Sequence, residues 1–244
     1  MAITHVLLDI EGTTCPVSFV AEALFPYARQ KLAEHLDGHR NDAEVQALIQ
    51  DIETSWKNNR DPSVPARGQN PSPLDVVPYL EWLIDHDIKL TALKDLQGRI
   101  WKAGYAQGEL VAPLFADVPE ALKRWHAQGL VLGVYSSGSV PAQQLLYGHS
   151  QQGDLRPYFS HWFDTRTGPK QDPKSYLTIA SLMKTTSEQV LFISDALSEL
   201  EAASKAGMRV LFSDREGNPG RDPGAFERIS DYTQLNPSHA AQPR

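Results

Sequence analysis

The sequence lacks several features, and each absence excludes a class of protein. Cys15 is its only cysteine, so no disulfide can form within the chain, and a reducing compartment such as the cytoplasm is expected. No apolar run is long enough to cross a membrane, and the N-terminus has no basic stretch followed by an apolar one. The net charge is −7 with no basic block, which argues against nucleic acid binding. These absences favour a cytoplasmic protein with neither a membrane nor a nucleic acid partner.

The chain is nevertheless large and apolar enough to bury a core. Its 244 residues are 41% hydrophobic and 22% charged, which is typical of a soluble protein. A chain of this length suits one large domain, or a core with a smaller second domain.

Short apolar runs alternate with helical patterns from Pro113 onward. Strands are expected at 130–135, 159–163, 190–193 and 209–212, and helices at 119–128, 141–147, 174–183 and 199–206. This alternation predicts an α/β fold with a doubly wound parallel sheet. The tail from Gly217 onward is rich in Pro, Gly and Asp, and is predicted to be loop.

A long helical segment separates the first strand, at residues 6–8, from the rest of this sheet. Helical spacing recurs over 17–36, 42–56, 76–84 and 91–106, with Pro26 expected to kink or divide the first helix. We therefore predict an α/β core made of residues 1–16 and 113–244. Residues 17–112 are predicted to form a helical cap domain that covers the strand ends.

The most informative stretch is HVLLDIEGTT, at residues 5–14. Its apolar part, residues 6–8, is typical of a strand buried on both faces, as in a parallel sheet. Gly12 ends the strand, so Asp9 and Glu11 come at its carboxyl end. In open α/β sheets the ligand crevice lies outside the carboxyl ends of the strands. A carboxylate there can hold a metal, attack phosphorus or move a proton.

Polar residues follow two further predicted strands. Ser136 and Ser137 follow one, Asp195 follows another, and a Gly-Pro-Lys segment ending in Lys170 lies between them. Parallel strands end at one edge of a sheet, so these side chains are expected to converge with Asp9. Two carboxylates suit Mg²⁺, which typically takes one or two of them together with water and substrate phosphate. A hydroxyl and a lysine would neutralise the other phosphate oxygens, and Asp9 could attack phosphorus in line.

The order D-x-E-G-T-T, strand-Ser-Ser-Gly, Gly-x-Lys and Ser-Asp-x₃-Glu resembles the four motifs of the haloacid dehalogenase superfamily of phosphatases. Within that superfamily, the chain resembles the enolase-phosphatases of methionine salvage. This closer similarity rests on DIEGTT, on VYSSGSVPAQQLLYGHS with the GDL that follows, and on LKDLQGRIWKAGY in the helical insertion. Together these segments span nearly the whole chain.

The resemblance implies a Mg²⁺-dependent reaction in two stages on 2,3-diketo-5-methylthiopentyl-1-phosphate. A proton leaves C1 to give an enol phosphate, and phosphate is then removed to give acireductone, 1,2-dihydroxy-3-keto-5-methylthiopentene. An enediolate needs a cation or hydrogen-bond donors on its oxygen, and Mg²⁺ can act there as a Lewis acid. The resemblance also implies a Rossmann-like core with a helical cap, one Mg²⁺ per chain, and a monomer.

The resemblance further implies roles for the acidic residues. Asp9 would be a Mg²⁺ ligand and the phosphoryl acceptor. Glu11 would bind the metal through its backbone carbonyl, and its side chain would be a candidate acid/base. Asp195 would be the remaining metal ligand from the protein. Glu199, in the last motif, would orient Lys170 or a metal-bound water.

Five residues are candidate contacts for the substrate or its phosphate. Ser136 and Ser137 would bind phosphate or the neighbouring carbonyl, although both could instead cap the following helix. Lys170 would balance charge on the phosphate, with Lys174 as a nearby alternative. Lys94, from the cap, and His149, in the Gly-His-Ser motif, would approach the substrate. These last two could also be structural, and Trp101, near Lys94, is expected to pack in the core.

Several alternatives remain open at this stage. Another phosphatase of the same superfamily, acting on a sugar phosphate, would also use Asp9 but would normally carry Asp where this chain has Glu11. An α/β-hydrolase is less compatible, because the segment around Ser136 lacks the first glycine of G-x-S-x-G. The base that takes the C1 proton is either Glu11 or a cap residue such as Lys94. The family's usual Arg-Pro-Gly-Asn loop is replaced by Asp-Arg-Glu-Gly-Asn at residues 214–218.

Overall fold

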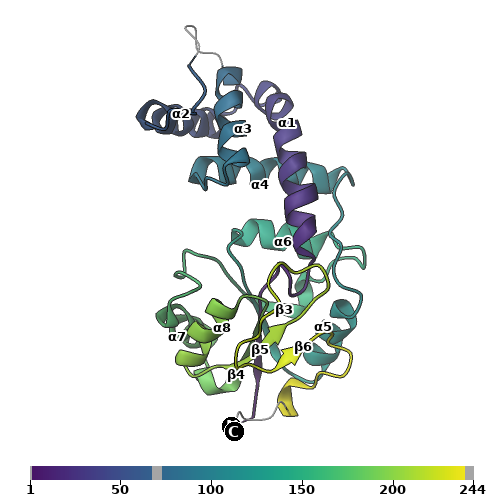
Figure 1. The fold of residues 1–244 in the computed structure, drawn as a ribbon. Helices are drawn as coiled ribbons and strands as arrows, with labels where there is room; N and C mark the ends of the chain where they lie inside the picture. The colour runs from purple at the N-terminus through teal and green to yellow at the C-terminus, as the bar shows by residue number, and fades with distance from the viewer. Residues whose placement is uncertain (1, 68–72, 240–244) are drawn as a thin grey trace. The chain divides into compact units, whose positions relative to one another are not determined.

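The computed structural model describes residues 2–67 and 73–239 (Figure 1). The chain divides into two compact units. The sheet unit contains the residues up to Val20 and those from Val111 onward, and the helical unit is Ala21–Leu110.

The sheet unit is built on six parallel strands. They are β1 (His5–Leu8), β2 (Val131–Tyr135), β3 (Phe159–Phe163), β4 (Val190–Ser194), β5 (Arg209–Ser213) and β6 (Arg228–Ile229). Their order across the sheet is β3-β2-β1-β4-β5-β6, so β1 lies near the middle and the chain crosses over it. This arrangement confirms the predicted doubly wound α/β fold.

One strand lies where the sequence predicted only loop. The segment β6 pairs with the end of β5, with Arg228 beside Phe212 and Ile229 beside Ser213. Two residues are too few to produce a recognisable period, so pairing with the edge of an existing sheet, rather than local sequence, determines this strand.

Helices cover both faces of the sheet. They are α5 (Val118–Ala127), α6 (Val140–Gly148), α7 (Pro173–Leu182) and α8 (Leu197–Lys205), with short 3₁₀ turns at Arg156–Tyr158, Ser187–Gln189 and Pro237–His239. Figure 1 shows α7 and α8 on one face and α5 on the other. Tyr176 and Leu200, from α7 and α8, pack with Leu7 and Phe192 of the central strands in one buried cluster. Burial on both faces explains why these strands are continuously apolar.

The helical unit contains α1 (Phe25–Gly38), α2 (Ala43–Asn58), α3 (Val77–Asp85) and α4 (Thr91–Ala106), with a 3₁₀ turn at Pro73–Val76. These helices surround their own apolar core, in which Leu32, Ile52, Leu80 and Leu96 are fully buried. The first predicted helix is divided, because a π-helical segment, Phe19–Leu24, precedes α1 and Pro26 lies in the first turn of α1. Proline is tolerated there since the first amides of a helix have no acceptor within it.

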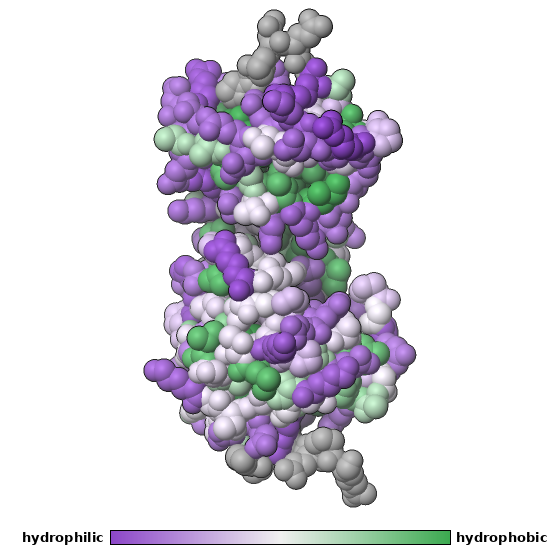
Figure 2. All heavy atoms as spheres, turned by 90° about the vertical axis from the view of Figure 1, so that its left-hand side faces the viewer, coloured by the Kyte–Doolittle hydropathy of each residue, from purple (hydrophilic) through white to green (hydrophobic). Residues whose placement is uncertain are grey.

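Polar residues make up most of the face shown in Figure 2. On the face shown in Figure 2, apolar residues form separate small patches among polar ones. Among the described residues, the exposed large apolar side chains are those of Leu74, Ile88, Val111, Leu177 and Leu182. None of the described helices combines the length and the apolar character that a membrane crossing requires.

Candidate active site

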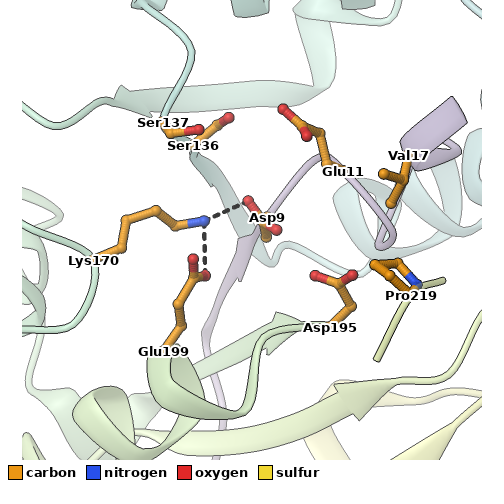
Figure 3. A pocket seen from close by; sticks show the side chains of 9 residues that line it. All are labelled: Asp9, Glu11, Val17, Ser136, Ser137, Lys170, Asp195, Glu199 and Pro219. Atoms are coloured by element: carbon orange, nitrogen blue, oxygen red, sulfur yellow. Dashed lines mark hydrogen bonds and ion pairs between the residues drawn. The ribbon is translucent and has the colours of Figure 1, made fainter. Parts of the chain in front are cut away.

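The strand register brings the predicted site residues to one edge of the sheet. Leu8, the last residue of β1, is paired with Val134 on one side and Ile193 on the other. Asp9, Ser136 and Asp195 each follow within two residues of these partners, at the carboxyl ends of adjacent strands. A pocket of about 230 Å³ opens at this edge (Figure 3). It is lined by Asp9, Glu11, Val17, Ser136, Ser137, Lys170, Asp195, Glu199 and Pro219.

A tight turn after β1 sets the direction of the acidic residues. The carbonyl of Ile10 accepts hydrogen bonds from the amides of Thr13, Thr14 and Cys15, and Gly12 has a φ of 65°. Glycine tolerates that left-handed conformation without strain. Cys15 is buried at the end of this turn, and burial together with Glu11 raises the pKa of its thiol to about 12. The thiol is therefore a packing group and not a nucleophile at neutral pH.

The close approach of neighbouring side chains also requires glycine at position 12. A Cβ atom at this position would lie 2.1 Å from Asp195 Oδ2 and 2.9 Å from Asn218 Nδ2. The Gly12 carbonyl accepts hydrogen bonds from Asn218 Nδ2 (2.9 Å) and from the Ser213 hydroxyl (3.0 Å). The backbone after Asp9 is thus held directly beside Asp195 by the segment that follows β5.

Lys170 forms the centre of a buried ion-pair group. Its Nζ lies 2.6 Å from Asp9 Oδ1 and 2.7 Å from Glu199 Oε2, and the Ser194 hydroxyl donates to Glu199 Oε2 at 2.9 Å. Burial alone would lower the pKa of Lys170, but the carboxylates of Asp9 and Glu199 outweigh it and raise that pKa. The amine therefore stays charged. Lys174, the alternative lysine, is exposed on α7 and does not line the pocket.

The other acids of the pocket carry more negative charge than the protein neutralises. Burial, followed by the charges of Asp9 and Glu199, raises the pKa of Asp195 to about 7. Burial and Asp9 likewise raise the pKa of Glu199. The lining contains four carboxylic acids and one amine. An excess of this kind favours a bound cation, because buried charge is costly unless it is compensated.

The two serines lie in the loop between β2 and α6. The Ser136 hydroxyl accepts from the Gly138 amide at 3.2 Å, and the N-cap residue of α6 is Ser139, without a side-chain cap hydrogen bond. The N-cap position of α6 is thus held by Ser139 and not by Ser136 or Ser137. Gln143 holds this loop by donating to the carbonyls of Gly138 and Phe163, both at 2.8 Å.

Two further candidate residues belong to other parts of the structure. His149 ends α6, with its ring Nδ1 3.0 Å from the Leu145 carbonyl, and its own carbonyl accepts from the Ala112 amide. Lys94 lies on α4 in the helical unit. Contact of either residue with the substrate stays a prediction. Trp101, on the same helix, is a packing residue as expected, because its Nε1 donates to the Leu24 carbonyl and its ring contacts Phe25.

Arg215 anchors the loop at 214–218, whose sequence departs from the usual pattern. Arg215 is only 4% exposed and forms two hydrogen bonds to Asp117, of 2.9 and 2.8 Å. Its guanidinium lies between the rings of Phe115 and Tyr232. This anchored arginine fixes the loop from which Asn218 reaches Gly12. Local sequence patterns do not indicate the pairing of Arg215 with Asp117, since the two residues are 98 positions apart.

Comparisons with known proteins agree with this geometry. A family model described as haloacid dehalogenase-like hydrolase matches residues 3–207. The chain is 49% identical to the enolase-phosphatase E1 of Parasynechococcus marenigrum (strain WH8102), over 97% of this chain and 99% of that protein. It is also 49% identical to the enolase-phosphatase E1 of Prochlorococcus marinus (strain MIT 9313), over 96% and 98%. The crystal structure of the UTR4 protein from Saccharomyces cerevisiae is similar, with a TM-score of 0.79 and 32% identity over 96% of this chain and 100% of that chain.

Proposed function

The chain belongs to the haloacid dehalogenase-like hydrolases and, within them, to the enolase-phosphatase E1 family, and on that premise we propose how its pocket performs the reaction. The enzyme converts 2,3-diketo-5-methylthiopentyl-1-phosphate, through its enol phosphate, into 1,2-dihydroxy-3-keto-5-methylthiopentene and phosphate. The roles assigned below to single residues are our proposal.

Asp9 is the phosphoryl acceptor in this proposal. One of its carboxylate oxygens attacks phosphorus in line, the bond between phosphorus and the enol oxygen breaks, and an aspartyl-phosphate forms on Asp9. Water then attacks that phosphorus and releases phosphate, which restores the carboxylate. The observation that carries this role is the contact of Asp9 with the charged Lys170, at 2.6 Å, at the carboxyl end of the central strand β1.

Lys170, Ser136 and Ser137 bind the transferred phosphoryl group. The amine of Lys170 neutralises the charge that develops on the phosphoryl oxygens, and the serine side chains and their loop provide hydrogen-bond donors. Glu199 keeps the Lys170 amine charged and aimed at Asp9, as the 2.7 Å ion pair supports. The side chain of Glu11 protonates the leaving oxygen and then takes a proton from the attacking water.

The donor set fits Mg²⁺. Among the described residues no three side chains of the Asp, Glu, His and Cys types come together as a ready-made metal cage. The carboxylates of Asp9 and Asp195 together with the Glu11 backbone carbonyl would hold the ion, and the remaining ligands would be waters and substrate phosphate. Burial, and after it the charges of Asp9 and Glu199, raise the pKa of Asp195, so a cation bound beside this carboxylate would favour its ionised form. When bound, Mg²⁺ supplies charge neutralisation at the phosphate and at the enediolate oxygen.

The enolase step requires a base near C1 of the substrate. Removal of the C1 proton leaves its electron pair to form the C1–C2 double bond, while the C2 oxygen takes up negative charge. Glu11 and Lys94 are the two candidates, and Lys94 and His149 are our candidate contacts to the rest of the substrate. We propose that Glu11→Gln and Lys94→Ala distinguish the two bases. Loss of C1 deuterium exchange in only one variant identifies the base.

The decisive experiment supplies the diketo phosphate to the purified chain with and without Mg²⁺, and follows phosphate release together with enediol absorbance. Both signals, dependent on Mg²⁺, are the expected result. Phosphate without the enediol would indicate another phosphatase activity, such as one on a sugar phosphate.

We also propose that the enzyme acts as a monomer in the cytoplasm. Size-exclusion chromatography tests the oligomeric state, and cell fractionation tests the compartment.

A further inference from the structure

Three side-chain hydroxyls donate to three successive backbone carbonyls immediately before and at Lys170. The Tyr135 hydroxyl donates to the Gly168 carbonyl at 2.9 Å, and the Ser175 hydroxyl donates to the Pro169 carbonyl at 2.7 Å. The Tyr176 hydroxyl donates to the Lys170 carbonyl, also at 2.7 Å. All three donor residues are almost completely buried, with exposed fractions of 3% or less.

These donors come from both sides of the segment they hold. Tyr135 is the last residue of β2, directly before Ser136, whereas Ser175 and Tyr176 lie in the first turns of α7. The rings of Tyr135 and Tyr176 meet edge to face, with centroids 5.5 Å apart. The Gly-Pro-Lys segment is therefore fixed between the strand that carries the phosphate-binding serines and the helix that follows.

The close approach of Ser175 also explains the glycine. A Cβ atom at position 168 would lie 2.2 Å from Ser175 Oγ. Any larger residue would displace the hydroxyl that holds Pro169. Because Gly168 has no side chain, the Ser175 side chain of α7 can pack directly against the backbone of the Gly-Pro-Lys segment.

Ordinary satisfaction of buried carbonyls does not explain all three contacts. Buried carbonyls need a donor, and a backbone amide suffices. The Pro169 carbonyl already accepts from the Asp172 amide at 3.1 Å, so the Ser175 hydroxyl is a second donor to the same oxygen. The feature that the three contacts share is the fixed position of the segment that ends in Lys170.

A lysine side chain has four rotatable bonds, and its amine reaches a defined point only if its backbone is fixed and its charge is compensated. The carboxylates of Asp9 and Glu199 fix one end of Lys170, and the three hydroxyls fix the other. We propose that Tyr135, Ser175 and Tyr176 are positioning residues that place the Lys170 amine for phosphoryl transfer. This inference rests on the role proposed above for Lys170.

The two tyrosines act as donors throughout the working pH range. Burial raises the pKa of both Tyr135 and Tyr176 above the usual value for tyrosine. Neither hydroxyl therefore ionises near neutral pH, and their hydrogen bonds to the backbone do not depend on pH there.

A double-mutant cycle on phosphate release tests the inference. Tyr176→Phe and Ser175→Ala each remove one hydroxyl with little change of shape, and each is combined with Lys170→Ala. Hydrolysis of p-nitrophenyl phosphate with saturating Mg²⁺ measures kcat and KM. Each single variant is expected to lower kcat about tenfold, since small displacements of a catalytic group have effects of this size. In the Lys170→Ala background the same substitutions are expected to change kcat less than twofold.

Tyr79→Phe is the matched control. Tyr79 is buried in the helical unit, where its hydroxyl contacts Ser55 and Asn59. This variant loses a buried tyrosine hydroxyl without touching the Gly-Pro-Lys segment, and kcat is expected to match the wild type. Thermal unfolding of all variants separates loss of stability from loss of rate.

Each remaining outcome has a defined meaning. Full activity of both Tyr176→Phe and Ser175→Ala overturns the positioning role. The role is also overturned if these substitutions lower kcat as much in the Lys170→Ala background as in the wild type, because the effect would then be structural. Wild-type activity of Lys170→Ala alone overturns the proposed role of Lys170, and the inference falls with it. If Tyr176→Phe reduces the yield of folded protein, Ser175→Ala provides the same test.

Discussion

Two partly buried charged groups flank Asp9, Lys170 on one side and Asp195 on the other, and their surroundings differ (Figure 3). Lys170 has two carboxylate partners within 2.7 Å, and hydroxyl donors hold its backbone. Asp195 faces the charges of Asp9 and Glu199, and its pKa is raised to about 7. One side of the site is electrostatically complete, whereas the other accumulates negative charge.

This difference indicates which parts of the site the protein supplies by itself. On the Lys170 side, the chain provides both the charge and its compensation, so this side is organised before any ligand binds. On the Asp195 side, the backbone of Gly12 comes close to the Asp195 carboxylate and offers no positively charged side chain. A divalent cation held by Asp9 and Asp195 would offset this negative charge.

Asp9→Asn is expected to have the largest effect, because it removes the group that both sides serve. An amide cannot attack phosphorus as a carboxylate does, so phosphate release should fall about a thousandfold or more. The fold should persist, since the amide keeps the shape of the side chain. Phosphate release and far-ultraviolet circular dichroism measure the two effects, and turnover near the wild-type rate would contradict the acceptor role.

Lys170→Met removes the amine that pairs with Asp9 and Glu199. Without the amine, Asp9 and Glu199 remain buried with no cation, which should cost about 3 kcal/mol of stability and about a hundredfold in phosphate release. The loss of stability should be larger at pH 8 than at pH 6, because Glu199 can take up a proton at the lower pH. Denaturant unfolding at both pH values measures it. Lys174→Met, at an exposed position on the following helix α7, is the control and should change neither quantity.

Asp195→Asn removes a negative charge from the other side of the site. Unlike Lys170→Met, it is expected to stabilise the metal-free protein. The pKa of Asp195 is above its ordinary value, so its contribution to stability is present below about pH 4 and is lost as pH rises through about 7. In the presence of a chelator at pH 8, the variant should therefore be more stable than the wild type, by about 2 kcal/mol. At pH 4 the two should be nearly equal.

The same variant should need about tenfold more Mg²⁺ for half-maximal activity, because one of two carboxylate ligands is lost. Thermal melts across pH, with chelator and with Mg²⁺, test both effects. An unchanged Mg²⁺ titration, or a destabilised metal-free protein at pH 8, would show that Asp195 is not the uncompensated ligand.

Local patterns predicted the strand ends well, and for a physical reason. The apolar run before Asp9 ends abruptly at a polar residue, and the same change occurs before Ser136 and Asp195. In a parallel sheet such changes all fall at one edge, so sequence alone was sufficient to bring these residues together. The helix boundaries were predicted within a few residues on the same basis, including the division at Pro26.

Long-range hydrogen bonds were not predictable in this way. The bond from Tyr135 to the Gly168 carbonyl joins residues 33 positions apart, and neither residue's pattern indicates the other. The same holds for Arg215 with Asp117, and for the short strand β6, which exists because β5 offers it an edge. The sequence locates groups that end an element, whereas contacts that hold those groups depend on the packing of distant elements.

Asn218→Ala should have the smallest effect, because it loosens the Asp195 side without changing its charge. Asn218 Nδ2 donates to the Gly12 carbonyl at 2.9 Å. When this donor is removed, the Ser213 hydroxyl still donates to the same carbonyl. A stability loss of about 1 kcal/mol is expected from one buried hydrogen bond. The Mg²⁺ concentration for half-maximal activity should rise about threefold, since Gly12 lies directly beside Asp195 and less rigid ligands bind less well. Asn59→Ala, in the helical unit, is the control for the loss of an asparagine and should leave the Mg²⁺ titration unchanged. If Asn218→Ala lowers kcat at saturating Mg²⁺ while the titration is unchanged, the asparagine serves the Lys170 side instead, and the division of the pocket into two independent sides is wrong.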